Sequence, residues 1–341
     1  MRRLIAAGLM LALAACAPNP GIPATPTKTP VALVDDERPA ATSIPTALPP
    51  TANTTDIPTT VPTETTTEPA PEPTTATPVE MLPPPTIDGA LPAETYCMIR
   101  PIPEGWRDFL DRTYAYGSTS GGQLRPHTGG EFWNPSGTPV VAVGNGAVVH
   151  AGNDWETAYG PDTGFYGNLI ILRLDTCPYN GRPVYALYGH LSEIYVETEQ
   201  TVPQGEIIGT VGGTGVANGG PHLHFEVRVD DPTSYFTSTR NPDLWIRPYF
   251  GYGTLAGRVV DAEGNYLREV ALTIRGEDAV RYTWTYAGDE NIGDDAWGEN
   301  FTYGDLPEGW YTVTTRSERR TYSEQVYINP GQTTWLEIVF D

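Results

Sequence analysis

The chain has 341 residues and a formal net charge of −22 at neutral pH, with 42 acidic side chains against 20 basic ones. A surface this acidic repels nucleic acids and anionic lipid headgroups, which excludes proteins that bind DNA or RNA through a basic face. The length allows two modest domains together with unstructured sequence. Hydrophobic residues make up 39% of the chain, and the stretch before Pro92 is the poorest in them.

The N-terminus has the pattern of an export signal. Arg2 and Arg3 precede a short apolar run that ends at residues 13–16, which read Leu-Ala-Ala-Cys. The run is shorter than the ~20 residues that a helix needs to cross a bilayer. A basic start, a short apolar run and small residues before a cleavage site predict a secretory signal over residues 1–16. Its end resembles a bacterial lipobox, which implies lipidation of Cys16 and a membrane anchor; an ordinary signal peptide cut near Ala15 is the alternative.

Residues 17–92 are rich in Pro, Thr and Ala and show no helical or strand periodicity. Such a segment cannot bury enough apolar surface to offset the entropy lost on ordering. We therefore predict a long disordered tether, which at ~3.1 Å per residue would reach on the order of 200 Å when fully extended. Its Thr residues are either glycosylated or bare, and the sequence does not distinguish the two.

The amino-acid composition changes at residue 93. Short runs rich in Val, Ile, Tyr and Leu alternate with turns that contain Gly, Asn or Pro, which predicts strands. The runs are residues 138–143, 146–151, 168–174, 183–188, 206–211 and 222–229. Only residues 105–113 have a weak helical pattern. We expect a mainly antiparallel β domain over residues 93–252, large enough for a core of its own.

A second series of short strands is expected over residues 254–341, where about seven runs with regular turn signals predict a β-sandwich. The runs are residues 256–260, 270–275, 282–286, 299–303, 310–315, 324–328 and 334–339. Residues 257–261 and 301–313 resemble the regulatory-like and collagen-binding-B-like sandwiches of surface proteins. The segment has no His or Cys. We expect it to serve in positioning, in adhesion or as a passive spacer.

Two cysteines remain beyond Cys16, namely Cys97 and Cys177. An exported protein meets an oxidising environment, which allows the two to form a disulfide. Two separate thiols are the alternative. No Cys-x-x-Cys spacing, typical of metal or redox sites, occurs in the chain.

All five histidines lie between residues 127 and 224. His222 and His224 are two residues apart in an expected strand, and side chains two apart in a strand point to the same face. Both imidazoles are therefore expected in one cleft, with Leu223 packed behind the sheet. A His-x-His pair alone is a weak signal, because it often arises by chance.

The sequence around these histidines is more specific. Residues 219–228 read Gly-Gly-Pro-His-Leu-His-Phe-Glu-Val-Arg, and residues 188–192 read Tyr-Gly-His-Leu-Ser. A third motif, His-Thr-Gly-Gly-Glu, begins at His127. In this order, with a Gly-containing hairpin at residues 202–212, the motifs resemble the lysostaphin and LytM endopeptidases. The resemblance implies that family's fold and a zinc endopeptidase acting on the peptide part of peptidoglycan.

The resemblance also implies the roles of individual residues. One Zn²⁺ would be held by His127, Glu131 and His224, with His190 and His222 beside it as catalytic residues. Catalytic zinc takes about three N or O ligands from the protein and keeps one position open. Imidazoles, which titrate near pH ~6.5, can move the protons without a separate glutamate base.

One position departs from the family, which has Asp where this chain has Glu131. The extra methylene moves the carboxylate by ~1.5 Å unless the loop adjusts, and metal sites tolerate only small errors in bond length. Three outcomes are open: Glu131 binds zinc with an adjusted loop, the histidines bind it alone and weakly, or the site has decayed into a binding module. No other carboxylate is close in sequence.

The remaining histidine, His150, matches none of the motifs, and we expect it to be structural or at the surface. Four aromatic residues fall in expected loops, where they would either wall a groove or pack in the ordinary way: Trp133, Tyr159, Phe165 and Tyr166.

The resemblance and the N-terminus together imply an exported, lipid-anchored zinc metallo-endopeptidase that faces the periplasm or cell wall. Its partners would be peptidoglycan peptide and, through the anchor, the membrane. Two alternatives stay open. One is a catalytically silent domain that binds peptidoglycan or activates another wall hydrolase, and the other is a surface adhesin that uses the C-terminal sandwich.

Overall fold

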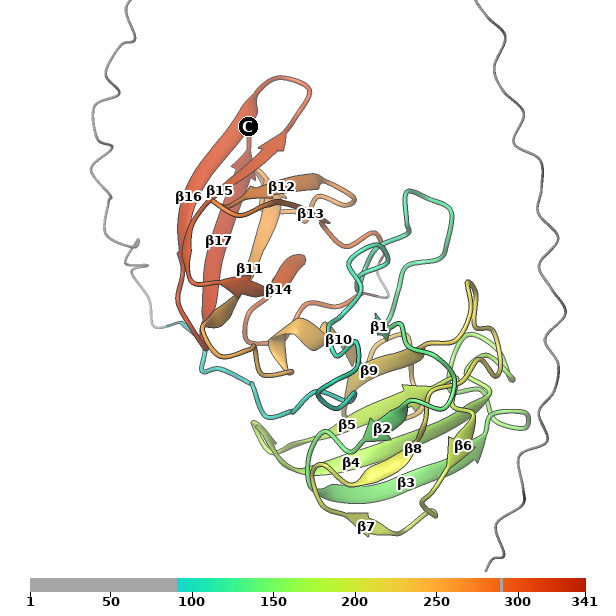
Figure 1. Ribbon diagram of the computed structural model, residues 1–341. Coiled ribbons are helices and arrows are strands. Elements are labelled where there is room, and N and C mark those ends of the chain that lie inside the picture. The colour runs from blue at the N-terminus through green and yellow to red at the C-terminus, as the bar shows by residue number, and fades with distance from the viewer. Residues whose placement is uncertain (1–90, 289–290) are drawn as a thin grey trace, which may run out of the picture. The chain divides into compact units, whose positions relative to one another are not determined.

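The computed structural model describes residues 91–288 and 291–341. The expected signal peptide with Cys16, and the tether up to residue 90, lie outside these residues. In the part that is described, no helix is long and apolar enough to cross a membrane. The described residues all belong to one compact unit, Thr77–Asp341. They form an almost entirely β structure with antiparallel sheets, as the strand patterns predict (Figure 1).

The first half of this unit contains a seven-stranded sheet in the order β1-β9-β5-β4-β3-β7, with β10 paired to β9. Its neighbouring strands are antiparallel throughout. The strands are β1 (Gly130–Phe132), β3 (Gly146–Asn153), β4 (Asn168–Tyr179), β5 (Arg182–Gly189), β7 (Thr201–Val202), β9 (Leu223–Val229) and β10 (Thr239–Arg240). A smaller sheet has the order β2-β8-β6. Its strands are β2 (Pro139–Val141), β6 (Glu193–Ile194) and β8 (Ile207–Thr210), and one 3₁₀ helix, η1 (Pro242–Leu244), follows β10.

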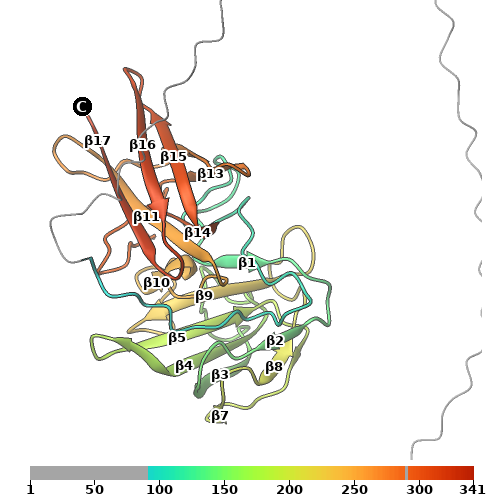
Figure 2. The ribbon, with the colours of Figure 1, turned by 60° about the vertical axis from the view of Figure 1, so that its left-hand side comes forward.

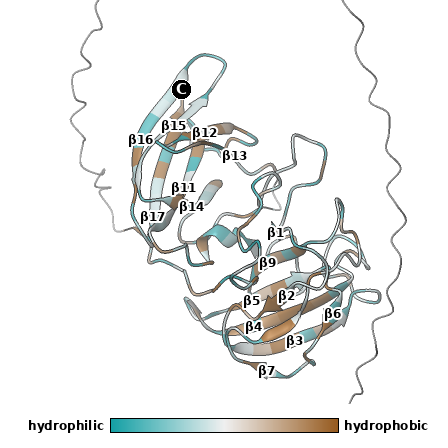
Figure 3. Cartoon of the chain, in the orientation of Figure 1, coloured by the Kyte–Doolittle hydropathy of each residue, from teal (hydrophilic) through white to brown (hydrophobic). Residues whose placement is uncertain are grey.

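The large sheet is packed on both faces. Ile170 and Leu172 of β4 belong to the main core, whereas the alternate residues Leu169 and Ile171 belong to a smaller cluster with Tyr166. This division follows from the alternation of side chains along a strand. The hydrophobic colour along β4 and β5 in Figure 3 marks the same region. Of the strands beside the histidine motifs, β5 and β9 are thus interior strands of this sheet, and β1 lies at its edge.

The prediction of a weak helix at residues 105–113 is wrong, since this segment consists of turns, bends and irregular backbone. Trp106 and Phe109 are exposed and only Leu110 packs into the core. A helix this short needs a packed apolar face, because it is unstable by itself in water. The backbone instead runs beside β1, where the Asp111 N–H donates to the Glu131 carbonyl at 2.9 Å.

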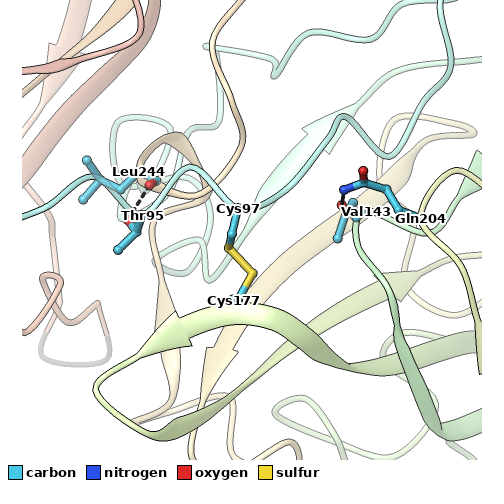
Figure 4. Close-up of a disulfide and its surroundings, with 6 residues drawn as sticks. All are labelled: Thr95, Cys97, Val143, Cys177, Gln204 and Leu244. Atoms are coloured by element: carbon cyan, nitrogen blue, oxygen red, sulfur yellow. Dashed lines mark hydrogen bonds between the residues drawn. A yellow bond between two sulfur atoms is a disulfide. The ribbon is translucent and has the colours of Figure 1, made fainter.

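Cys97 and Cys177 form a disulfide that ties the start of the described chain to the end of β4 (Figure 4). Their Cα atoms are 5.3 Å apart, and the bond closes a sequence separation of 80 residues. In the chain-entropy account, a loop of that length corresponds to ~4.5 kcal/mol of stabilisation. The same region is joined to η1 by the hydroxyl of Thr95, which donates to the Leu244 carbonyl at 2.7 Å.

The second half has two sheets that share one hydrophobic core, in the orders β14-β11-β17 and β13-β12-β15-β16. The strands are β11 (Tyr252–Asp261), β12 (Ala271–Arg275), β13 (Val280–Trp284), β14 (Phe301–Pro307), β15 (Gly309–Arg316), β16 (Thr321–Ile328) and β17 (Thr333–Phe340). Each corresponds to a predicted run, with ends that differ by a few residues. The pair β11 and β17 is parallel, an exception to the antiparallel pattern.

The two halves are joined by extensive polar and apolar contacts. Arg112 forms an ion pair with Asp243 at 2.6 Å and also donates to the Gly304 carbonyl at 3.0 Å. Ala256 and Trp297, from the second half, are members of the main core of the first half. The division of the sequence into domains at residues 93–252 and 254–341 stays a prediction. The two segments share core residues and an ion pair, so they are packed against each other.

Candidate metal centre and substrate groove

Three neighbouring strands bring the motif residues together. Strand β9 lies between β1 and β5, with His224 opposite Glu131 on one side and opposite Gly189 on the other. His127 precedes β1, His190 follows β5, and His222 directly precedes β9. The motifs are far apart in the sequence, but the register places their four histidines and one carboxylate at the same end of these strands.

His127, Glu131 and His224 are buried and offer ligand atoms that all lie within 4.8 Å of one another. Nε2 of His127 lies 3.0 Å from Oε1 of Glu131 and 3.3 Å from Nδ1 of His224, and the Glu131 and His224 atoms are 3.2 Å apart. In a tetrahedron with zinc bonds of ~2.0–2.1 Å, ligand atoms are ~3.3 Å apart. Two imidazoles and a carboxylate at this spacing fit the ligand set of a catalytic zinc.

The second nitrogen of each ligand imidazole has a hydrogen-bond acceptor. Nδ1 of His127 lies 2.7 Å from the Tyr114 carbonyl, and its ring stacks on the Tyr114 ring with centroids 4.0 Å apart. Nε2 of His224 lies 3.0 Å from Oε1 of Glu226. A ring nitrogen that donates to an oxygen leaves the lone pair on the other nitrogen. These two acceptors therefore leave the Nε2 lone pair of His127 and the Nδ1 lone pair of His224 free, on atoms 3.3 Å apart.

Glu226 is itself held by a buried network that sequence reasoning missed. Thr128 and Tyr166 donate to its Oε1 at 2.6 Å each, and Arg228 donates to its Oε2 at 2.7 Å. Burial acts to raise the pKa of Glu226, but Arg228 and then His224 lower it to about 2. The sequence did contain a signal for this network. Side chains alternate between the two faces along β9, so residues 222, 224, 226 and 228 share one face.

The charges in the centre are strongly coupled. Burial acts to raise the pKa of Glu131, but hydrogen bonds from His127, His222 and His224 lower it well below its usual value. Burial acts to lower the pKa of His224, and hydrogen bonds to Glu131 and Glu226 outweigh it and raise the pKa to about 9. The two carboxylates thus favour positive charge at His224. A metal cation held by these three atoms would compete with that proton.

His190 and His222 lie beside the ligands with their rings 4.9 Å apart. Nδ1 of His190 lies 2.8 Å from the Thr214 carbonyl, and Nδ1 of His222 lies 2.8 Å from the Gly220 carbonyl. Both rings therefore turn Nε2 away from these carbonyls. His190 has φ of +62°, a left-handed conformation that non-glycine residues adopt rarely and that tends to occur at functional sites. Burial, and then the charges of His224 and His222, lower its pKa to about 4, so its ring is neutral at pH 7.

The centre opens into a groove of about 940 Å³ that is lined by the loops on either side of it. Of the aromatic residues considered from the sequence, Trp133 and Phe165 line the groove, and Trp133 packs against the His222 ring at 4.6 Å. Tyr166 is fully buried behind the ligands. Tyr159 instead pairs with His150, their OH and Nδ1 atoms 3.0 Å apart, and neither lines the groove.

The second half of the chain holds one wall of the groove. Asn291 donates from Nδ2 to the His127 carbonyl at 2.6 Å, and the same carbonyl accepts the Gly117 N–H at 2.8 Å. The Ala287 N–H in turn donates to the Gly117 carbonyl at 2.9 Å. Gly117 has φ of +76°, and a Cβ there would lie 2.4 Å from the Tyr286 ring, so only glycine fits. No sequence motif indicated that residues of the second half contact the His127 backbone.

Comparison with known proteins agrees with this geometry. The model of the family described as Peptidase family M23 matches residues 125–235. This segment is a peptidase family M23 domain. All five motif residues lie inside it, and the resemblance predicted from the three motifs is confirmed there. The resemblance of residues 254–341 to surface-protein sandwiches stays a prediction.

Several relatives share the M23 segment. A metalloprotease of Haemophilus influenzae is 38% identical over 109 residues, which is 32% of this chain and 20% of that protein. The peptidoglycan DD-endopeptidase ShyC of Vibrio cholerae is 36% identical over 109 residues, or 32% and 22% of the two chains. Lysostaphin of Staphylococcus simulans is 32% identical over 158 residues, or 45% and 28%. The match thus spans less than a third of each relative.

Among solved structures, the catalytic domain of lysostaphin from Staphylococcus simulans is 30% identical, with a TM-score of 0.29. The match covers 42% of this chain and 85% of that domain.

Proposed function

We propose that the M23 domain is a zinc-dependent endopeptidase that hydrolyses peptide bonds in peptidoglycan. The observation that carries the proposal is the set of three buried ligand atoms 3.0–3.3 Å apart, with two further imidazoles beside them at the floor of a groove. The names of relatives such as ShyC support peptidoglycan as the substrate class.

In this proposal His127, Glu131 and His224 hold one zinc ion. The ion would supply Lewis-acid activation of water and of the scissile carbonyl. The chain contributes the fixed lone pairs of the two imidazoles, the negative charge of Glu131 and a buried environment in which electrostatic interactions are stronger than in water. The carboxylate of Glu226 fixes the ring of His224 and thereby its ligand atom.

His190 and His222 are the proposed catalytic residues. A neutral imidazole at His190 can accept a proton from the attacking water and later donate it to the leaving amine. An N–H of the neighbouring imidazole can donate to the oxygen on which negative charge develops. Both tasks use the Nε2 atoms, because the backbone carbonyls of Thr214 and Gly220 engage the two Nδ1 atoms. Nε2 of His222 lies 2.8 Å from Oε2 of Glu131, so it has to leave this contact to reach the substrate.

We further propose that the protein works outside the cytoplasm, attached to a membrane through a lipidated Cys16. The disulfide between Cys97 and Cys177 supports this location, because such bonds persist in oxidising compartments. Replacing Cys16 by Ser should release the protein from the membrane fraction into the soluble fraction. Protein that stays in the membrane fraction after Cys16→Ser would show that another element anchors it.

The test of the activity is digestion of purified peptidoglycan, with the released peptides identified by mass spectrometry. We expect the wild type to contain about one equivalent of zinc and to cleave. His222→Ala should retain the metal and lose cleavage, while His224→Ala should lose both. His150→Ala is the matched control, since His150 lies outside the groove, and it should behave as the wild type. Cleavage that survives His222→Ala would overturn the mechanism.

A catalytically silent domain that only binds peptidoglycan is the second candidate. It is favoured by the contact between Oε2 of Glu131 and Nε2 of His222, 2.8 Å apart, which joins a catalytic imidazole to the ligand carboxylate. Zinc content separates the two candidates: less than about half an equivalent after gentle purification would favour the silent domain.

A further inference from the structure

The outer face of the sheet β13-β12-β15-β16 carries large aromatic side chains. Leu272 and Ile274 of β12 point into the core, so the alternate residues of this sheet point outward. On the edge strand β13 the outward residues include Tyr282 and Trp284, which are 56% and 43% exposed. Trp284 lies opposite Ala271 on the neighbouring strand β12, so its cross-strand neighbour is a small side chain. Contiguous exposed apolar surface of this kind marks binding sites on soluble proteins.

Between the aromatic residues the outer face is rich in hydroxyls. The registers place Tyr282, Thr273, Thr314 and Ser323 in one row across the four strands. At the other end of the face, Trp310 lies opposite Tyr327, with ring centroids 5.3 Å apart. We define the outer face by its outward residues, which are Ala271, Thr273, Arg275, Val280, Tyr282, Trp284, Trp310, Thr312, Thr314, Arg316, Thr321, Ser323, Gln325 and Tyr327.

The charge of the outer face differs from that of the whole chain. None of its residues, all of them described, is Asp or Glu, although the chain carries a net charge of −22. Its charged members are Arg275 and Arg316, both exposed. A polymer with carboxylate groups is repelled by an acidic surface, and the outer face contributes no carboxylate of its own to that repulsion. A carboxylate that borders it is that of Glu308, which accepts a hydrogen bond from the Tyr327 hydroxyl at 2.9 Å.

The edge of the outer face is also continuous with the groove of the metal centre. Trp284 and Glu269 line a hollow of about 370 Å³ together with residues 117–121. Thr113 and Ser120 line both this hollow and the groove. Figures 1 and 2 both show β13 beside the blue-green segment that precedes β1. A long substrate that lies in the groove therefore meets β13 on leaving it.

We propose that the outer face binds the glycan strand of peptidoglycan while the groove binds the attached peptide. The identification of this polymer as peptidoglycan rests on the proposed function. Pyranose rings have apolar C–H faces that pack on aromatic rings, and the flanking Trp284 and Tyr282 present such rings. Sugar hydroxyl and amide groups hydrogen-bond to Thr and Ser side chains, and Arg side chains pair with carboxylates.

The first test is co-sedimentation of the full chain with purified, insoluble peptidoglycan in the presence of a chelator, so that no cleavage occurs. We expect Trp284→Ala and Tyr282→Ala each to weaken binding by about tenfold, as for an aromatic residue central to an interface. The matched control is Trp155→Ala, because Trp155 is 57% exposed and lines neither the groove nor the hollow. With zinc restored, Trp155→Ala should cleave a short soluble peptide at the wild-type rate, and Trp284→Ala and Tyr282→Ala should lose more activity on insoluble peptidoglycan than on that peptide.

The second test isolates the charge of the outer face. Thr273→Glu adds a carboxylate at its centre, and Thr273→Gln adds an uncharged side chain of the same shape. We expect Glu to weaken binding severalfold more than Gln, and the difference to shrink at high ionic strength. Equal binding by the two variants at low ionic strength would contradict the proposed role of charge.

Competition identifies the bound part of the polymer. Soluble glycan oligosaccharides without peptide should displace the wild type and have little effect on the residual binding of Trp284→Ala, whereas cross-linked peptides without glycan, which enter the groove, should displace both proteins to the same extent. Unchanged binding of Trp284→Ala, or equal displacement of the wild type and Trp284→Ala by glycan oligosaccharides, would overturn this inference even if the protein cleaves peptidoglycan. A chain that binds glycan through the outer face but cleaves no wall peptide would instead overturn the proposed activity and support this inference.

Discussion

Oε2 of Glu131 lies 2.8 Å from Nε2 of His222, and Oε1 of the same carboxylate lies 3.0 Å from Nε2 of His127. One carboxylate therefore contacts both a proposed metal ligand and a proposed catalytic residue. The reach of the Glu side chain makes this double contact possible, and the Asp of related peptidases is shorter by one methylene. The contact suggests that Glu131 restrains His222 as well as holding the metal.

Shortening this side chain tests the restraint. In Glu131→Asp we expect zinc to stay bound and kcat to remain equal or to rise by up to about fivefold, the equivalent of one modest hydrogen bond. Kinetics on a soluble peptide, with metal analysis of the same samples, measure both effects. Glu131→Gln, which removes the charge but keeps the length, should lose zinc. Loss of zinc from Glu131→Asp would show that the longer side chain is needed to reach the metal.

Glu226→Gln tests the orientation of His224. The amide keeps much of the size and hydrogen-bonding capacity that Arg228 and Tyr166 use, but it no longer holds the His224 ring with a charge. We expect zinc affinity to fall by about 10–100-fold, as for other partners of ligand histidines. Competition with a chromophoric chelator measures the affinity without reference to activity. The control is the exposed Glu156→Gln, and equal affinity of the two variants would show that Glu226 does not position the ligand.

Asn291→Ala tests whether the second half of the chain supports the centre. The variant removes the buried hydrogen bond to the His127 carbonyl, a loss that costs about 1–3 kcal/mol. We expect a lower melting temperature and weaker zinc binding, because the His127 backbone is then less restrained. Asn265→Ala, at an exposed position of the same half, should change neither. If the second half served only as an adhesin, Asn291→Ala would leave zinc affinity at the wild-type value.

Glu299 predicts a pH dependence of stability. Its side chain is buried, and burial followed by the charge of Asp294 raises its pKa from 4.5 to about 8. The folded state then binds more protons than the unfolded state between these values, so this stabilisation is complete below about pH 4.5 and is lost as pH rises through 8. The melting temperature should fall over that range, with a slope of at most ~1.4 kcal/mol per pH unit from this group. Glu299→Gln should make the melting temperature less dependent on pH. An unchanged pH dependence would show that Glu299 is not the group responsible.

The sequence by itself predicted the strands and the motifs, because both depend on local patterns. The runs at residues 168–174 and 183–188 became β4 and β5, since apolar and β-branched residues between turns favour strands wherever they occur. The spacing of His222 and His224 placed both rings on one side of the chain, because the period of a strand is two. The helix predicted at residues 105–113 is wrong, because a short local pattern does not stabilise a helix unless an apolar face packs against the rest of the protein.

Only the tertiary structure decided how these pieces meet. The antiparallel register places Glu131 opposite His224, and that pairing, rather than any motif, brings the carboxylate to both histidines. Asn291 contacts His127 across 164 residues of sequence, and the pairing of Cys97 with Cys177 spans 80. Such contacts depend on the register and packing of segments far apart in the chain. A pattern read within one short segment carries no information about which distant segment will lie beside it.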